Sequence, residues 1–378
     1  MARTTTANAP TVTNLSDHKL PKVDEGPRPG RDLAFTAIRS LALVVVVLWH
    51  WVFATVRWDA TGPHSGNPLH VVPAGFVLTW FLQVMPVFFL VGGWASCGSL
   101  LRHRQRNGSD RAWVSARISR LARPALPLAA GLVVAKLLLS PWLFGVILLA
   151  ASPLWFLGVY LPLTALTPVL MRWHRRSPAI AFGCTAAALM ATEFARFGFG
   201  SDSTAMTLAA LLTVWGFIYQ VGFYLETLRA NPQKACVLSF AGIVGIGVCV
   251  AMGLPASMVA VKGDVISNMG PPTVAIVMLG LFQAGLIAML ADRFGRVVMR
   301  PTIGSLIRWI DTNQMTIYIV HLPIWVIQLV VLRHSVFGLA DTPTLGWLAT
   351  RPLWLIGPGF ALLRLLSVLR LVPKQAAR

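Results

Sequence analysis

The sequence predicts an all-α integral membrane protein with about ten transmembrane helices and both chain ends in the cytoplasm. The first observation is composition, because the 378 residues are 56% hydrophobic and only 12% charged, whereas soluble domains carry about a quarter charged residues. The second is a series of apolar runs that recur along nearly the whole chain. The third is that the basic residues lie in short clusters between these runs, as is typical of multi-pass membrane proteins.

A transmembrane helix needs roughly 20 predominantly apolar residues. This criterion predicts ten helices, over Leu33–Trp58, Ala74–Leu101, Pro124–Phe144, Leu154–Met171, Ala179–Arg196, Ala205–Leu225, Cys236–Leu254, Thr273–Ala291, Asn313–Leu332 and Trp347–Val368. The segment between Ser140 and Pro153 is apolar enough to be a re-entrant or interfacial piece.

The orientation follows from the basic residues, which are retained mainly on the cytoplasmic side of a membrane. With the N-terminus inside, 25 of the 32 Lys and Arg residues fall in cytoplasmic segments, five in outer loops, and Arg39 and Lys136 within spans. This distribution also explains the net charge of +19 without a nucleic-acid partner, since no single soluble face collects the charge.

Outside the membrane domain at residues 33–370, the sequence predicts two short tails. Residues 1–32 are rich in Thr, Pro and Asn and lack the apolar core of a signal peptide, so we expect a disordered cytoplasmic tail. Residues 371–378 form a short basic cytoplasmic tail. The four cysteines lie in or beside apolar runs without a paired motif, which predicts packing roles and no metal site.

Two polar residues interrupt the first predicted span. Arg39 and His50 are eleven residues apart, close to three helical turns, so they share one face about 16 Å apart along the axis. A charged side chain inside a span costs at least about 2.5 kcal/mol and is by default a candidate for function. Each residue also has a structural alternative to a functional role. Arg39 could extend its side chain back to the membrane interface, and His50 could be a neutral histidine that forms a hydrogen bond between helices.

With these residues the opening "GRDLAFTAIRSLALVVVVLWH" resembles the membrane acyltransferase type 3 family. The resemblance continues in order through "VMPVFFLVGGWASCGSLLRHR", "RISRLARPALP", "LWFLGVYL" and "MTIYIVHLPIW", while "SMVAVKGDVISNMGPPT" and "LFQAGL" look like an actinobacterial branch. The chain departs from the family where many members have a histidine before Trp-Phe-Leu, because Pro153 and Leu154 stand there. The spacing of the arginines also leaves open which cluster fills the family's Arg-x-Arg role.

The resemblance implies an integral-membrane O-acyltransferase that moves an acyl group from a cytoplasmic acyl-CoA to a hydroxyl of a sugar, glycan, glycolipid or natural product. Acetyl-CoA is the default donor. His50 would be the general base or a transient acyl carrier, since histidine is matched to neutral pH, and Arg39 would hold the donor or a developing oxyanion.

The CoA end of such a donor carries phosphates, which guanidinium groups bind well. The candidates lie between the second and third predicted spans, although positive-inside topology alone explains a basic loop there equally well. They are Arg102, Arg104, Arg106, Arg117, Arg120 and Arg123.

Five further residues are weaker substrate-binding candidates, each with a structural alternative. Glu193 is expected to pair with Arg196 one turn on, Gln220 to join helices, and Trp155 to belong to an aromatic belt. Tyr318 and His321 lie three residues apart on one face of the ninth span and could reach the same cavity as His50.

A transporter or flippase for an acidic or glycosylated small molecule is the competing interpretation. The sequence lacks the matched hydrophobic halves and broken helices of inverted-repeat transporters. A purely structural membrane protein would give no reason to place Arg39 and His50 in a span. The sequence predicts a lipid-bilayer environment and a hydroxyl-bearing acceptor, and it leaves the oligomeric state open.

Overall fold

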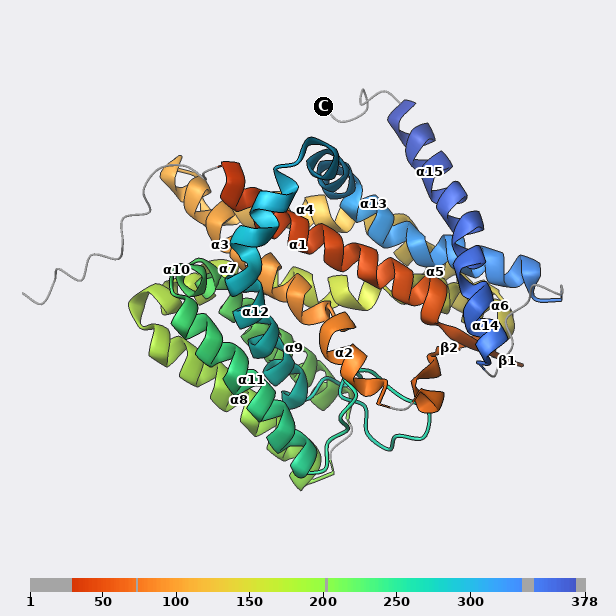
Figure 1. The fold of residues 1–378 in the computed structure, drawn as a ribbon, viewed down its shortest axis with the longest axis horizontal. Helices are drawn as coiled ribbons and strands as arrows, with labels where there is room; N and C mark the ends of the chain where they lie inside the picture. Colours follow the sequence, from red (N-terminus) through yellow and green to blue (C-terminus); the bar gives the residue numbers. More distant parts are fainter. Residues whose placement is uncertain (1–28, 73, 201–202, 335–342, 372–378) are drawn as a thin grey trace, which may run out of the picture.

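The computed structural model describes residues 29–72, 74–200, 203–334 and 343–371 (Figure 1). The α-helices are α1 Pro29–Leu48, α2 Phe76–Leu82, α3 Met85–Gln105, α4 Asp110–Ala122, α5 Leu126–Leu138, α6 Pro141–Ala151, α7 Leu154–Arg176, α8 Pro178–Gly198, α9 Thr204–Val221, α10 Leu225–Ala230, α11 Pro232–Ala251, α12 Val274–Val298, α13 Pro301–Leu332, α14 Leu345–Thr350 and α15 Ile356–Leu371. The remaining elements are the π-helix η1 Trp49–Phe53, the strands β1 Thr55–Asp59 and β2 Gly62–Gly66, and the 3₁₀-helices η2 Pro68–Val71, η3 Arg123–Ala125, η4 Gly222–Tyr224 and η5 Arg351–Leu355.

The predicted all-α membrane architecture is confirmed. Within the described residues, ten helical segments are long and apolar enough to cross a membrane. They cover Leu33–Phe53, Phe76–Gln105, Asp110–Leu138, Leu154–Arg176, Pro178–Gly198, Thr204–Ala230, Pro232–Ala251, Val274–Val298, Pro301–Leu332 and Gly346–Leu369. The apolar piece between Ser140 and Pro153 is the short helix α6, which packs between α5, α13 and β2.

The first predicted span is wrong at its end. Helical structure stops at Phe53, and the following β-branched and aromatic residues form β1, paired antiparallel with β2 from Thr55 opposite Gly66 to Asp59 opposite Gly62. The two-residue turn between the strands suits a tight hairpin, and Gly62 supplies a φ of +114° there. The predicted span runs past Phe53 because Val56 and Trp58 are themselves apolar.

Several other spans differ in their boundaries, and the ninth begins at Pro301 rather than at the predicted Asn313. The second is broken between α2 and α3, where Pro86 lies in the first turn of α3 and has no N–H for a continuous helix. The third begins at Asp110 and ends at Leu138, and the last starts with the short α14 and η5. At the N-terminus, α1 begins at Pro29, while the rest of the predicted tail lies outside the described residues.

The two ends of the helical bundle differ in chemistry, and they are called the basic end and the hairpin end. The basic end is the end at which α1 begins, and there Arg229 of α10 donates to Asp292 of α12. At the hairpin end, Arg333 after α13 lies 4.7 Å over the Trp58 ring of β1. Figure 1 shows α1 crossing the middle of the molecule, with α8 and α11 on one side and α15 on the other.

The core is built around α12, which packs against α1, α3, α9 and α11. Close approach between helices depends on small residues, as is typical of membrane bundles. Gly93 of α3 is the clearest case, because a Cβ there would overlap the backbone carbonyl of Tyr219 on α9. In contrast, a Cβ at Gly131 on the exposed surface of α5 would meet no atom within 4 Å.

We expect Gly93→Ala to destabilise the protein, since the backbone of α9 cannot move away without repacking the core. The expected result is a melting temperature lower by roughly 5 °C or more in a thermal-shift measurement of the purified protein. Gly131→Ala is the matched control and should hold or slightly raise the melting temperature, because alanine favours helix over glycine. Equal melting temperatures for the two variants would contradict the close packing of α3 on α9.

Candidate functional site

Arg39 of α1 pairs with Asp311 of α13. The guanidinium Nη2 donates to Asp311 Oδ1, and both side chains are about a third exposed, at 29% and 32%. Arg39 Nε is buried without a hydrogen-bond partner among the described residues. The arginine is therefore held between two helices and retains one free donor, and it does not simply reach back to the interface.

His50 of η1 meets His321, which is fully buried in α13. His50 Nδ1 lies 3.3 Å from His321 Nε2, and the ring centroids are 5.2 Å apart. Because Arg39 and His50 both contact α13, the structure places the two polar residues of α1 on a common face. Their partners Asp311 and His321 are ten residues apart, so α1 and α13 run parallel.

The hydrogen bonds around this pair define which nitrogen of His50 is free. His321 Nδ1 lies 2.7 Å from the carbonyl oxygen of Tyr318, which can only accept, so His321 Nδ1 carries the hydrogen. With both rings neutral, His321 Nε2 accepts and His50 Nδ1 donates. His50 Nε2 therefore keeps its lone pair.

A buried arginine fixes the π-helix that carries His50. Arg351 of η5 is 0% exposed and donates from Nε to the carbonyl of Val52 at 2.6 Å and from Nη2 to the carbonyl of Trp51 at 2.9 Å. Its guanidinium also lies 4.7 Å from the ring centroid of Trp347 and 5.1 Å from that of Trp354. These contacts satisfy carbonyls that the end of η1 leaves free and stabilise the charge through the indole faces.

A cavity of about 630 Å³ opens beside His50 at the hairpin end. Its lining residues come from the β1–β2 hairpin, from α6 and the turn after it, and from α13. They are His50, Thr61, Pro63, His64, Ser65, Pro141, Phe144, Gly145, Leu148, Leu149, Ser152 and Leu322. The titratable groups in this lining are His50, at the end of the first span, and His64, on the hairpin.

The six candidate arginines are gathered at the basic end and have different environments. Arg104 makes two hydrogen bonds to Asp110, at 2.8 and 2.9 Å, and is occupied by that carboxylate. Arg117 of α4 points inward, with Nη2 3.5 Å from Ser96 Oγ and a buried Nε that has no partner among the described residues. The others are exposed at the surface, and they are Arg102, Arg106, Arg120 and Arg123.

Three of the weaker candidates lie away from the cavity or serve packing. The Tyr318 hydroxyl donates to the carbonyl of Pro153, which ties α13 to the start of α7. Gln220 of α9 accepts from Thr185 Oγ1 at 3.0 Å and so joins α9 to α8. Trp155 lies against Trp215 with ring centroids 5.9 Å apart. Of the five, His321 alone contacts His50.

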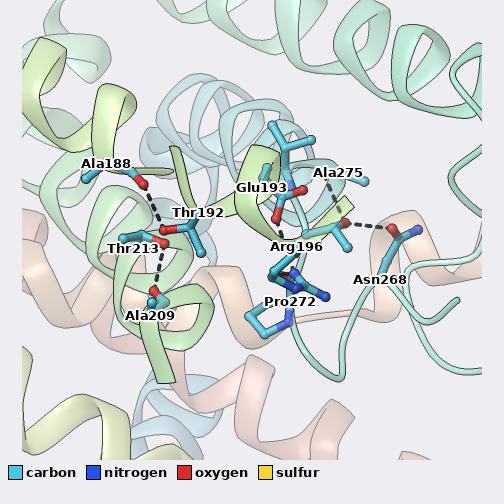
Figure 2. Close-up of polar contacts among 11 residues, drawn as sticks. Ala188, Thr192, Glu193, Arg196, Ala209, Thr213, Asn268, Pro272 and Ala275 are labelled. Atoms are coloured by element: carbon cyan, nitrogen blue, oxygen red, sulfur yellow. Dashed lines mark hydrogen bonds and ion pairs between the residues drawn. The ribbon is translucent and has the colours of Figure 1, made fainter. Parts of the chain in front are cut away.

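Glu193 belongs to a separate polar cluster that holds the loop before α12 (Figure 2). Its carboxylate accepts from Arg196 at 3.2 Å and from the backbone N–H of Val274 at 3.2 Å. Arg196 also donates to the carbonyl of Pro272, and Asn268 holds the same loop through Thr273. The expected pairing of Glu193 with Arg196 is confirmed, and Glu193 does not line the cavity beside His50.

Sequence reasoning did not select Asp311 or Arg351 as site residues. Asp311 lies two positions before the predicted start of the ninth span, which puts it in a cytoplasmic segment of the predicted topology. In the same topology Arg351 is one of the five basic residues of the outer loops. A signal was present for Asp311, since its separation of ten from His321 nearly matches the separation of eleven between Arg39 and His50.

Comparison with known families agrees with this geometry. The profile of the acyltransferase domain family known as acyltransferase 3 matches residues 32–369. No curated protein and no solved structure matches the chain. Since the match covers nearly all of the helical bundle, the chain belongs to the acyltransferase 3 family and is a multi-pass membrane O-acyltransferase.

Proposed function

We propose that the protein transfers an acyl group, by default acetyl, from a cytoplasmic acyl-CoA to a hydroxyl of a sugar, glycan, glycolipid or natural product. In this proposal His50 is the general base. The observation that carries it is the contact of His50 Nδ1 with His321 Nε2, which leaves Nε2 as the unengaged nitrogen of a ring that lines the cavity. A base needs such a nitrogen within reach of the hydroxyl that it deprotonates.

The basic end of the bundle suits the anionic part of the donor. Arg117 offers a half-buried guanidinium with an unused Nε, and the exposed arginines beside it supply further positive charge. Guanidinium groups bind phosphate through charge-assisted hydrogen bonds. The positive-inside rule places this end, with both termini, in the cytoplasm, where acyl-CoA is available.

The proposed reaction moves one proton and exchanges two bonds. The acceptor hydroxyl gives its proton to His50 Nε2 as its oxygen bonds to the thioester carbonyl carbon. The carbon–sulfur bond then breaks, and the CoA thiolate leaves with the proton from His50. The products are an ester and the CoA thiol. The same nitrogen could instead attack the thioester itself and carry the acyl group as an acyl-imidazole.

Arg39 lies on the donor side of His50 in this proposal. Its pairing with Asp311 fixes the guanidinium, while the unpaired Nε provides one directed donor. A carbonyl oxygen of the donor arm or the developing oxyanion could accept from that N–H. A preorganised donor of this kind is worth roughly a hundredfold or more in rate at an oxyanion.

Replacing His50 by alanine should abolish acyl transfer, because in this proposal the acceptor hydroxyl gives its proton to His50 Nε2. We expect a loss of at least about a hundredfold in kcat. Each variant is expressed in a deletion strain, and lipid, glycan and metabolite extracts of the strains are compared by mass spectrometry. A product that lacks the acyl group shows the loss of transfer. His70→Ala is the matched control, since His70 is exposed in η2 and does not line the cavity. Normal acylation by His50→Ala, at equal membrane expression, would exclude His50 as the base.

Arg39→Lys keeps the charge and the pairing with Asp311 but removes the directed Nε–H donor. We expect transfer to fall about tenfold or more while the melting temperature changes little. Asp311→Asn should instead lower both activity and melting temperature, because the Arg39 charge then loses its partner inside the membrane. Wild-type kinetics for Arg39→Lys would limit Arg39 to a structural role.

A further inference from the structure

We propose that the cavity beside His50 binds an amphipathic acceptor anchored in the membrane. Its hydroxyl-bearing head group would lie between His50 and the β1–β2 hairpin, and its apolar tail would lie along α6. The proposal rests on the function proposed above and adds the chemical class of the acceptor.

The cavity has two chemically different walls. The hairpin wall presents the side chains of Thr61, His64 and Ser65, which donate and accept hydrogen bonds. The α6 wall presents Phe144 and Leu148 together with Leu149, which are apolar. A fully hydrated sugar would leave hydroxyls unpaired against the α6 wall, at a cost in free energy. A molecule with a polar head and an apolar tail satisfies both walls.

Asp59 organises the polar wall from behind. Its Oδ1 accepts from Thr61 Oγ1 at 2.6 Å, from the Thr61 backbone N–H at 2.8 Å and from His64 Nε2 at 3.1 Å. The two bonds from Thr61 are the main reason that the pKa of Asp59 is lowered to about 2, so the carboxylate is ionised at neutral pH. The hairpin side chains are thus ordered by a fixed negative charge.

This arrangement defines what His64 offers to a ligand. A carboxylate oxygen can only accept, so His64 Nε2 carries the hydrogen and Nδ1 of the neutral ring is an acceptor. His64 is 47% exposed, and no hydrogen bond to Nδ1 is recorded within the described residues. A sugar hydroxyl, which donates and accepts, complements an Nδ1 acceptor next to the Ser65 hydroxyl.

The apolar wall borders the lipid-facing surface. Leu148 lines the cavity and is 48% exposed, and Leu137 and Leu138 on the adjoining α5 are 75% and 76% exposed. These side chains face hydrocarbon in a membrane-spanning bundle, because no described part of the chain covers them. A lipid-like tail can therefore continue from the cavity into the bilayer along α6.

The two walls are held at a fixed separation. Gly62 of the hairpin turn lies against α6, where a Cβ would come within 2.8 Å of the Trp142 carbonyl oxygen, and a Cβ on Gly145 would overlap the Thr61 carbonyl oxygen at 1.9 Å. Trp58 of β1 stacks on Trp142 of α6, with ring centroids 6.1 Å apart, and Arg333 covers both rings. The site is preformed, which reduces the entropy lost on binding.

The test uses octyl β-glucoside with a diazirine at the end of its octyl tail as the probe. The full-length protein is irradiated with it in phospholipid nanodiscs, and the labelled peptides are mapped by mass spectrometry. We expect labelling on α6 that excess octyl β-glucoside displaces and methyl β-glucoside, which has the same head and no tail, does not. His64→Ala should reduce the displaceable labelling about fivefold, the equivalent of one neutral hydrogen bond. His70→Ala is the control and should label like the wild type.

Three outcomes would overturn the proposal. Labelling of α6 that no competitor displaces would show only partition into lipid. Equal displacement by methyl β-glucoside would show that the tail does not contribute to binding. Displaceable labelling of His64→Ala at the wild-type level would show that the hairpin does not contribute. The labelling experiment measures binding, so its result does not depend on the acyl-transfer reaction. Normal acyl transfer by His50→Ala would overturn the proposed base but not the proposed acceptor site. Labelling that no competitor displaces, together with an inactive His50→Ala variant, would overturn only the acceptor site.

Discussion

Two polar contacts inside the membrane join α1 to α13, and the candidate site depends on them. Arg39 pairs with Asp311, and His50 meets His321 about three turns further along. Left without partners in hydrocarbon, the charged groups would be costly, which makes the paired arrangement strongly favoured. Two contacts at different heights fix both the rotation and the register of α1 against α13. Arg351 then fixes the π-helix that presents His50 to the cavity.

This arrangement separates the two substrates of the proposed reaction. The arginines that suit an anionic donor are at the basic end, whereas the cavity with its polar hairpin is at the other end of the bundle. His50 and Arg39 lie between them on one helix. An acyl group held on a long, thin arm could therefore reach His50 from one side while its acceptor arrives from the other, so that the two ligands do not compete for the same space.

The spans and the shared face of Arg39 and His50 could be predicted because hydropathy and helical period are local properties of the chain. The hairpin could not, because Val56 and Trp58 continue the apolar run and their strand conformation depends on pairing across the turn. Asp311 and Arg351 were missed for a related reason. Their roles come from contacts with residues 272 and 299 positions away. For Asp311 the spacing to His321 is the one hint of its partner, and for Arg351 the local sequence gives none.

The protonation state of His50 is the most direct test of its proposed role as the general base. Solid-state NMR of the nitrogen-labelled histidines, taken as the difference between wild type and His50→Ala in lipid at neutral pH, reports which ring nitrogen carries hydrogen. If His50 is the base, its ring is neutral, with the hydrogen on Nδ1 and none on Nε2. A hydrogen on Nε2 would contradict this role, because the nitrogen left for the acceptor hydroxyl could then not take up a proton.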